Sequence, residues 1–231
     1  MKASAMREEI CRVGRSLFER GYVHATAGNI SVRLDAEEGG GFLITPTDAC
    51  LGFLKPERLA RLDENGVQTS GDAASKTIVL HQRIYRAAAA AGAPARCIIH
   101  THSSQCVALT LGSLMQPAPH GRELMPALTP YFFVMKVGHV PVMDYARPGD
   151  PGAAVEVENA IARYSLAAIP LRAVMLERLG PNVWHDSPAA AMATLEELEE
   201  TARLWHRCNG AAVPLNDGQL DVLRATFGAR W

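Results

Sequence analysis

Apolar residues recur along the chain at two spacings, one typical of helices and the other of strands. Ile10, Val13 and Leu17 follow the period of an amphipathic helix over residues 3–20. Gly21 then ends that helix. The same reasoning predicts further helices over 75–91, 104–111, 152–165 and 188–208. Short apolar or alternating runs predict strands at 26–34, 42–45, 61–62, 67–69, 97–102, 137–142 and 173–176.

The order of these elements predicts how they pack. Asn65-Gly66 is the dipeptide of a tight hairpin, and residues 37–41 form a hairpin-like loop, so the early strands pair antiparallel. Later strands are connected through helices. A chain with both kinds of connection builds a mixed sheet covered by helices. Without repeats or a linker, we expect one domain over residues 1–231. Residues 113–130 hold four prolines and predict a long loop.

The composition is that of an ordinary soluble globular protein. The net charge is −1 and 20% of residues are charged, which gives no basic surplus for nucleic acid and no basic cluster for a membrane surface. We expect no membrane span, because no run of 18 residues is apolar throughout, and no signal peptide, because the N-terminal segment is charged. Five scattered cysteines without CxxC spacing indicate reduced thiols in a cytoplasmic protein.

Two histidines at the end of the predicted strand over 97–102 are candidate metal ligands. Side chains at positions i and i+2 of a strand point to the same face, so His100 and His102 can both reach one ion at about 2.0–2.1 Å. The pair precedes a helix and therefore lies at the C-terminal edge of its strand, where α/β folds gather ligands. The alternative is a pair of exposed histidines on an edge strand. A catalytic zinc also takes a third protein ligand, which this motif does not supply.

Other short motifs accompany the pair. In chain order they are Gly28-Asn29-Ile30-Ser31, Ile44-Thr45-Pro46-Thr47, Ser75-Lys76 ahead of His81, and Ile99-His100-Thr101-His102-Ser103. With this set the chain resembles the class II aldolase/adducin family over nearly its whole length. Within the family it is most similar to the bacterial branch that acts as 3-oxo-tetronate 4-phosphate decarboxylase. The segments that carry this similarity are 22–31, 47–54 and 136–141.

The resemblance implies a three-layer α/β/α sandwich with a central mixed, largely antiparallel sheet. It also implies a homotetramer with active sites at the subunit interfaces. It implies one Zn²⁺ per subunit on His100 and His102, and a small phosphorylated keto-acid or keto-sugar as substrate. The residues that it implies for binding the substrate phosphate are Gly28, Asn29, Thr45, Thr47, Ser75 and Lys76.

The residue types suit that phosphate site. Gly28 lets backbone N–H groups approach an anion, Asn29 and the hydroxyls donate hydrogen bonds, and Lys76 supplies positive charge. The alternative is structural, because Thr45-Pro46-Thr47 can be a turn that ends a strand and Asn29 a turn residue.

The chain departs from the family's pattern at two positions. Where the family commonly carries a glutamate that accepts the proton, this chain has Thr77. Where the family carries a third zinc histidine, this chain has Leu179, which cannot bind zinc. His139 is the preferred third ligand instead, with Glu177 next. The alternative for His139 is a strand-end histidine that hydrogen-bonds to the backbone.

The missing glutamate favours one reaction over another. An aldolase or an epimerase needs a base to form an enediolate. Loss of CO2 from a 3-oxo acid leaves the electrons behind, so it needs a cation that holds the enediolate oxygens. On this hypothesis the catalytic residues are Lys76, which grips the phosphate, and Tyr131, which protonates the product unless a water does so. A sugar-phosphate aldolase and a non-catalytic assembly module like the adducin head are the alternatives, and the intact histidine pair argues against the second.

Overall fold

One eight-stranded sheet forms the centre of the computed structural model, which describes residues 3–112 and 115–231. In spatial order its strands are β4 (Gln68–Ser70), β3 (Ala60–Leu62), β2 (Phe42–Ile44), β1 (Asn29–Arg33), β5 (Cys97–His100), β10 (Gly180–His185), β9 (Ala173–Leu176) and β8 (Val142–Met143). Neighbours pair antiparallel except β8 and β9, which are parallel. The expected mixed, largely antiparallel sheet is confirmed.

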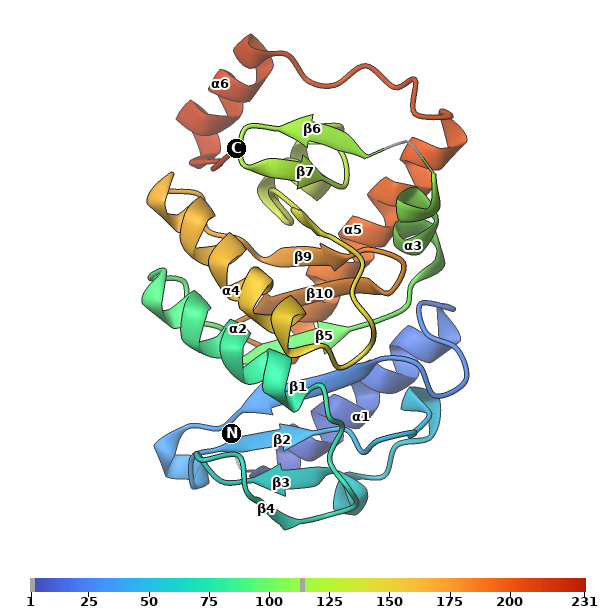
Figure 1. The fold of residues 1–231 in the computed structure, drawn as a ribbon, viewed down its shortest axis with the longest axis vertical. Helices are drawn as coiled ribbons and strands as arrows, with labels where there is room; N and C mark the ends of the chain where they lie inside the picture. Colours follow the sequence, from blue (N-terminus) through green and yellow to red (C-terminus); the bar gives the residue numbers. More distant parts are fainter. Residues whose placement is uncertain (1–2, 113–114) are drawn as a thin grey trace.

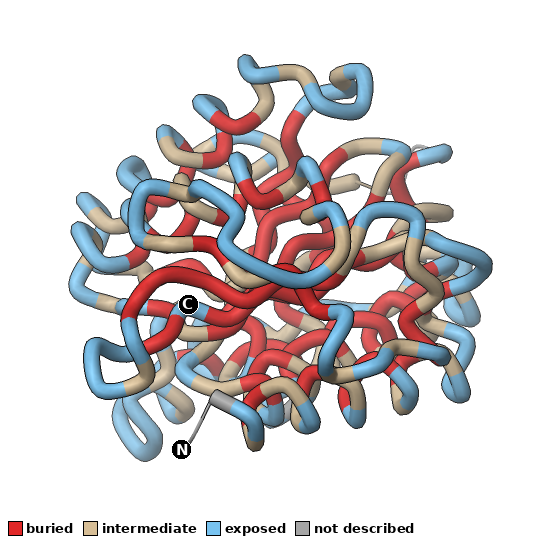
Figure 2. The backbone as a smooth tube through the Cα atoms, turned by 90° about the horizontal axis from the view of Figure 1, so that it is seen from below, coloured by how far each residue is buried: buried red, intermediate tan, exposed pale blue. Residues whose placement is uncertain are grey.

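Helices cover both faces of this sheet (Figure 1). α1 (Ala3–Glu19) and α5 (Pro188–Arg207) lie on one face, and α2 (Ile78–Ala90) and α4 (Pro151–Leu166) lie on the other. Successive strand residues serve the two layers, since Ile99 packs in the apolar cluster that includes α1 and α5, and Ile98 packs in the one that includes α2 and α4. The three-layer α/β/α sandwich is therefore confirmed. In Figure 2 the buried backbone runs through the middle of the molecule and the exposed segments lie around it.

The helices begin where the sequence provides caps. The side chain of Asp150 accepts a hydrogen bond from the Gly152 N–H ahead of α4, and that of Ser187 accepts one from the Ala190 N–H ahead of α5. Proline occupies the first position of both helices, where its missing N–H costs nothing. The remaining helices are α3 (Ser104–Leu111), α6 (Asp217–Phe227), the 3-10 helices η1 (Ala36–Glu38), η2 (Leu51–Phe53) and η3 (Pro56–Arg58), and the π-helix η4 (Pro130–Met135).

Several boundaries differ from the expected ones. α2 begins at Ile78 because Ser75 turns the chain ahead of it, its carbonyl accepting from the Ile78 N–H. The strand expected over 137–142 is wrong for most of its length. It is reduced to β8, because η4 precedes it and Gly138 has a left-handed φ of +79°.

The proline-rich stretch expected as a loop over 113–130 contains a small hairpin instead. Its strands are β6 (Gln116–Ala118) and β7 (Gly121–Glu123), while residues 113 and 114 lie outside the described part of the chain. Besides this hairpin and the short helices η1 to η4, the strand β10 and the helix α6 are additional to the expected set. In the described part of the chain we find no helix long and apolar enough to cross a membrane.

Candidate functional site

Three central strands place polar residues side by side at one end of the sheet. In register, Asn29 of β1 lies opposite His100 of β5, and His100 lies opposite Asn182 of β10. Residues directly opposite one another point to the same face of a sheet, which here is the face that α2 covers. Asn182 is therefore a site residue that the sequence did not reveal, because its strand was not anticipated.

The two expected metal ligands lie together, although not as neighbours on one strand. His100 is the last residue of β5 and His102 follows it outside the strand, with their ring centroids 5.0 Å apart. Nδ1 of His100 lies 3.0 Å from the carbonyl oxygen of Pro181. A carbonyl can only accept, so Nδ1 carries the hydrogen and Nε2 keeps its lone pair for a ligand.

Both imidazoles of the pair are neutral near pH 7. Burial, and after it the neighbouring His102, lowers the pKa of His100 to about 4. Burial, and after it the neighbouring His24, lowers the pKa of His102 as well. No carboxylate of the described residues contributes to either shift. Neutral imidazole is the form that ligates metals, so the pair stands ready to bind a cation.

Two glycines hold the histidine segment in place from either side. Gly28 has a φ of +84°, and a Cβ there would lie 2.7 Å from the carbonyl oxygen of His100. Gly180 has a φ of +140°, and a Cβ there would lie 1.9 Å from the carbonyl oxygen of Thr101. Both the left-handed backbone and the close approach require glycine at these positions. The chain segments before β1 and β10 therefore pack directly against the backbone of the histidine motif.

A buried polar chain runs behind the pair. Nδ1 of His81, on α2, lies 2.8 Å from Oγ of Ser31, and that hydroxyl lies 2.9 Å from the hydroxyl of Tyr85. The Tyr85 hydroxyl also donates to the Ser31 carbonyl oxygen. Burial, and after it the neighbouring His100, lowers the pKa of His81 to about 3. His81 is therefore a buried, packed histidine, and it is held in the neutral form.

Several buried polar atoms in this region lack a hydrogen-bond partner. Among the described residues they include Oδ1 of Asn29, Nε2 of His81 and both side-chain polar atoms of Asn182. The Asn182 amide lies near enough to His81 to offset part of that residue's pKa shift, although no hydrogen bond of full geometry joins them. Buried polar groups are nearly always satisfied. These unpaired side-chain atoms are therefore suited to hydrogen-bond with the polar atoms of a ligand.

The segments expected to hold the phosphate converge on the turn ahead of α2. Nδ2 of Asn29 donates to Oγ1 of Thr77 at 3.2 Å, and Oγ of Ser75 donates to the same oxygen at 3.3 Å. The Ser75 N–H donates to the carbonyl oxygen of Thr45, and the Thr47 N–H to that of Ala73. The structure thus brings together three segments that are far apart in sequence.

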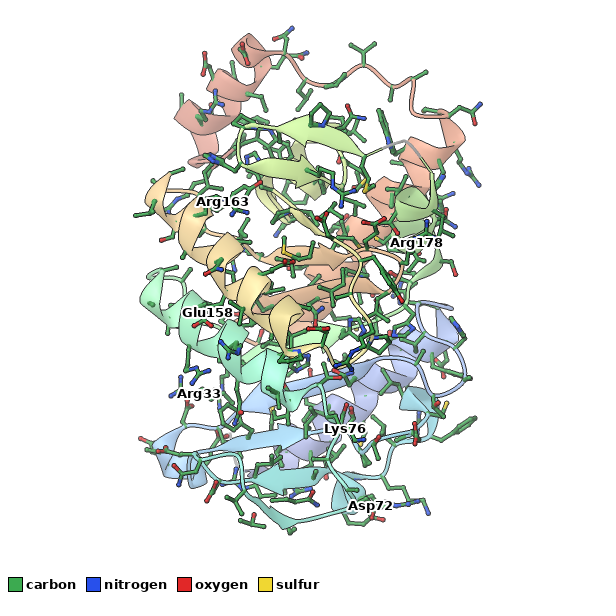
Figure 3. All side chains as sticks on the ribbon, viewed as in Figure 1. Arg33, Asp72, Lys76, Glu158, Arg163 and Arg178 are labelled. Atoms are coloured by element: carbon green, nitrogen blue, oxygen red, sulfur yellow. The ribbon has the colours of Figure 1, made fainter. Side chains whose placement is uncertain are left out.

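The side chains in these segments have different surroundings. Thr45 is fully buried and its Oγ1 accepts from the backbone N–H of Ile30, so it ties the end of β2 to β1. Thr47 and Lys76 are exposed. Figure 3 shows Lys76 at the start of α2, beside the ends of β1 and β2. A phosphate at this turn would therefore meet a hydroxyl and a positive charge.

The structure does not bring His139 to the histidine pair. Its Nδ1 lies 2.7 Å from Oε1 of Glu123, and its ring stacks on Trp231 with centroids 4.2 Å apart. The Tyr164 hydroxyl donates to the same Glu123 oxygen. Among the described residues, no three His, Cys, Asp or Glu side chains are placed to hold a metal ion. The expected group of three histidines is therefore not formed within this chain, and the partner of His139 is a carboxylate rather than the backbone.

The turn between β9 and β10 passes close to the backbone of the histidine motif. It contains Leu179, next to the Gly180 backbone that contacts Thr101 and the Cα of His102. Leu179 itself packs against the apolar cluster around α2 and α4. Glu177, the other expected ligand, instead accepts a hydrogen bond from Arg122 at 3.0 Å. Neither of these two residues is therefore shown as a ligand of the pair, since Leu179 has no donor atom and Glu177 is engaged by Arg122.

Tyr131, the expected proton donor, lies on η4. Its side chain is 54% exposed, and Nζ of Lys136 lies 5.1 Å from its ring centroid. η4 packs against α5 and α6. Within a single chain, Tyr131 is therefore a surface residue.

Comparison with known proteins adds a family match and three similar proteins to this geometry. Residues 8–206 match the family model of the class II aldolase and adducin N-terminal domain. A 3-oxo-tetronate 4-phosphate decarboxylase from Cupriavidus necator is 48% identical, over 99% of this chain and 98% of its own. The crystal structure of YgbL from Escherichia coli has 33% identity and a TM-score of 0.81, over 96% of this chain and 99% of its own. The L-fuculose-1-phosphate aldolase of Thermus thermophilus has 26% identity and a TM-score of 0.67, over 91% of this chain and 98% of its own.

Proposed function

Because this chain belongs to the class II aldolase and adducin N-terminal domain family, we propose that it is a lyase that decarboxylates a 3-oxo-tetronate 4-phosphate. The observation that carries the proposal is the 48% identity, over nearly the whole of both chains, to a protein named for that activity. In this reaction the C1–C2 bond breaks and CO2 leaves. The electron pair passes into a C2–C3 enediolate, and C2 then takes a proton to give dihydroxyacetone phosphate.

The geometry around Thr77 supports decarboxylation over aldol cleavage. Aldol chemistry needs a base near the reacting carbon. The residue that faces Asn29 at the start of α2 is Thr77, whose hydroxyl already accepts from Asn29 and Ser75. A hydroxyl at this position cannot serve as a carboxylate base. Decarboxylation needs none, since the departing CO2 leaves its electrons on the substrate.

A zinc ion of the family type would be held by His100 and His102, and it would supply the positive charge that stabilises an enediolate. Both residues fit that role, because they are neutral and Pro181 fixes the ring of His100 with its free nitrogen available. The fit is partial, however, since the described residues supply no third ligand.

The remaining residues bind and orient the substrate. Lys76 and the Thr47 hydroxyl bind the phosphate, with Ser75 and the backbone at Gly28 closing the same turn. The buried Thr45 holds the loop in shape behind them.

Asn29 belongs to the phosphate-binding turn, where its amide contacts Thr77, and the amide of Asn182 offers buried hydrogen-bonding atoms to the oxygens at the other end of the substrate. Because the substrate is fixed by the phosphate on C4, the C1 carboxylate at its other end can leave as CO2.

The proton for C2 comes from Tyr131 or from water. Tyr131 is an exposed residue of η4, so it can reach the site of a neighbouring copy. We therefore propose that Tyr131 serves the site of a neighbouring copy, in a cytoplasmic homotetramer whose active sites lie at the subunit interfaces. Tyr131→Phe should then slow proton delivery to C2 while leaving the unfolding free energy unchanged, because the side chain is exposed.

The test is an assay of both enantiomers of 3-oxo-tetronate 4-phosphate with saturating Zn²⁺. Formation of dihydroxyacetone phosphate is followed by its enzymatic reduction with NADH, and CO2 is measured in parallel. The unphosphorylated 3-oxo-tetronates are the control and should react at least tenfold more slowly. The proposal fails if neither phosphorylated enantiomer yields dihydroxyacetone phosphate faster than it decarboxylates spontaneously.

A sugar-phosphate aldolase is the second candidate, favoured by the likeness to the Thermus thermophilus enzyme. It is recognised if dihydroxyacetone phosphate and a small aldehyde condense in the presence of the protein. A protein that yields neither reaction under these conditions would instead fit an assembly module, such as the adducin branch of the family.

A further inference from the structure

A hollow of about 410 Å³ lies where β1 ends, away from the histidine pair. Its lining comes from Arg33 of β1, from Arg86 of α2 and from the turn at 64–65 between β3 and β4. Asn29 and Arg33 are the two ends of β1, about 13 Å apart along an extended strand, and Figure 3 shows Arg33 to the left of Lys76. The volume suits a small molecule. We call this site the arginine hollow.

Two guanidinium groups line the arginine hollow without a carboxylate partner. Arg33 and Arg86 come from different elements, and within the described part of the chain neither side chain forms an ion pair. By contrast, Arg83 from the same helix pairs with Glu158 at 2.6 Å. A guanidinium presents its N–H donors in a planar fork that matches the oxygens of a phosphate or a carboxylate. Two such groups at one hollow therefore make a site for an anion.

The hollow also carries groups that suit hydroxyls. Glu64 supplies a carboxylate, which accepts hydrogen bonds, while Asn65 and Gln82 supply amides that both donate and accept. A carboxylate repels a bare anion, but it accepts hydrogen bonds from the hydroxyls of a polyol. The combination of two guanidiniums with a carboxylate and two amides therefore fits an organic anion that bears hydroxyl groups better than it fits an inorganic one.

Glycines allow two of these polar side chains to lie directly on neighbouring backbone. Gly66 has a φ of +83°, and a Cβ there would lie 2.8 Å from Nε2 of Gln82. Gly40 has a φ of +59°, and a Cβ there would lie 2.6 Å from Oε1 of Glu64. Gln82 of α2 therefore packs against the hairpin turn, and Glu64 of that turn packs against the loop at 39–41. These contacts join the separate segments that form the hollow.

We propose that the arginine hollow binds a small phosphorylated polyol. Arg33 and Arg86 bind the phosphate, and Glu64 with the two amides binds the hydroxyls. The buried rings of Phe42 and Tyr85, which also line the hollow and stack with centroids 5.6 Å apart, contact the carbon chain. The hollow shares no residue with the histidine pair or with the phosphate turn ahead of α2, so the inference does not depend on the reaction proposed above.

The probe is D-ribitol 5-phosphate, and binding is measured by calorimetry at low ionic strength, where charge–charge attraction is least screened. The protein carries Lys76→Met, which weakens binding at the proposed catalytic phosphate site. We expect one molecule to bind per chain at least tenfold more tightly than inorganic phosphate, because the hydroxyls add hydrogen bonds to charged and polar groups. Free ribitol should show no measurable binding. Absence of binding by the probe, or equal affinity for the probe and inorganic phosphate, would overturn the inference.

Arginine variants locate the phosphate. Arg33→Gln and Arg86→Gln, each in the same background, should weaken binding of the probe at least tenfold, because each removes charge-assisted hydrogen bonds. Arg163→Gln is the matched control, since Arg163 is an exposed arginine of α4 outside the hollow. It removes the same charge and should leave the affinity unchanged. Equal losses in all three variants would show a general attraction to positive charge and would contradict a built site.

Glu64→Ala tests the hydroxyl contacts. Removal of the carboxylate should weaken binding of D-ribitol 5-phosphate, which loses an acceptor, and should tighten binding of inorganic phosphate, which loses a repulsion. Affinities that change in the same direction for both probes would refute the assignment of Glu64. All of the substituted arginines and Glu64 are exposed, so each variant should unfold at the same urea concentration as its parent, which separates lost binding from lost folding.

Discussion

Gly28→Ala tests how closely the histidine motif depends on its neighbours. The new Cβ would lie 2.7 Å from the carbonyl oxygen of His100, and a carbon and an oxygen in contact stay about 3.3 Å apart. One of the two backbones must therefore move by about 0.6 Å. The left-handed φ of +84° adds about 1–2 kcal/mol of strain for any residue with a Cβ.

Gly21→Ala separates these two effects. Gly21 has a similar φ of +74°, but a Cβ there meets no atom within 4 Å. It should therefore lose about 1–2 kcal/mol of unfolding free energy from strain alone, with unchanged kcat/KM. Gly28→Ala should lose more stability than Gly21→Ala and should also lower kcat/KM roughly tenfold, because a shift of a fraction of an ångström misplaces His100.

The measurements are urea unfolding and steady-state formation of dihydroxyacetone phosphate, made on both variants and on the unchanged protein. Equal kcat/KM for the two variants would refute the reasoning, since it would mean that the close approach of Gly28 to His100 does not position the site. A stability loss at Gly28 no greater than at Gly21 would show that the contact relaxes without cost.

Three further predictions follow from single side chains. Thr45→Val leaves the buried N–H of Ile30 without its side-chain acceptor and should lower the free energy of unfolding in urea by about 1–3 kcal/mol. Thr45→Ser should lower it clearly less, and equal losses would contradict the role of the hydroxyl. Lys76→Met should raise KM at least tenfold with little change in unfolding free energy, since the side chain is exposed; an unchanged KM would exclude Lys76 from the phosphate site. The pKa of His81 is about 3 in the folded protein, below its ordinary value of 6.5. Between these two pH values the unfolded chain binds more protons than the folded one, so the free energy of unfolding should fall as the pH drops from 6.5 towards 3. His81→Asn should flatten that dependence in unfolding measured at stepped pH, and an unchanged slope would assign it to other groups.

Much of the architecture could be predicted from the sequence. The elements that were not predicted depend on tertiary contacts rather than on local sequence. Helical periodicity located α1, α4 and α5, where local preference and burial agree. β10 was missed because Gly180 and Pro181 at its start are typical of turns. Their place in the sheet is set by tertiary contact, since Gly180 is needed where the chain passes against Thr101.

The site was predictable only in part for the same reason. The motifs indicated that His100, Asn29 and Ser75 belong together, and the structure brings their segments to one end of the sheet. His139 could not be placed from sequence, because its partner Glu123 lies on a hairpin in a segment whose prolines predicted a loop. Asn182 became visible only through its register with His100.

The row of Asn29, His100 and Asn182 also has a consequence for how the protein folds. Its members come from the first, middle and last thirds of the chain and meet only when β1, β5 and β10 have paired. Pairings this distant in sequence have a high loop-closure cost and form late. The helices can therefore appear early in refolding while this end of the sheet is still absent. A chain emerging during synthesis brings these three residues together only after β10 has been made, so their pairing reports that the central strands of the sheet are in place.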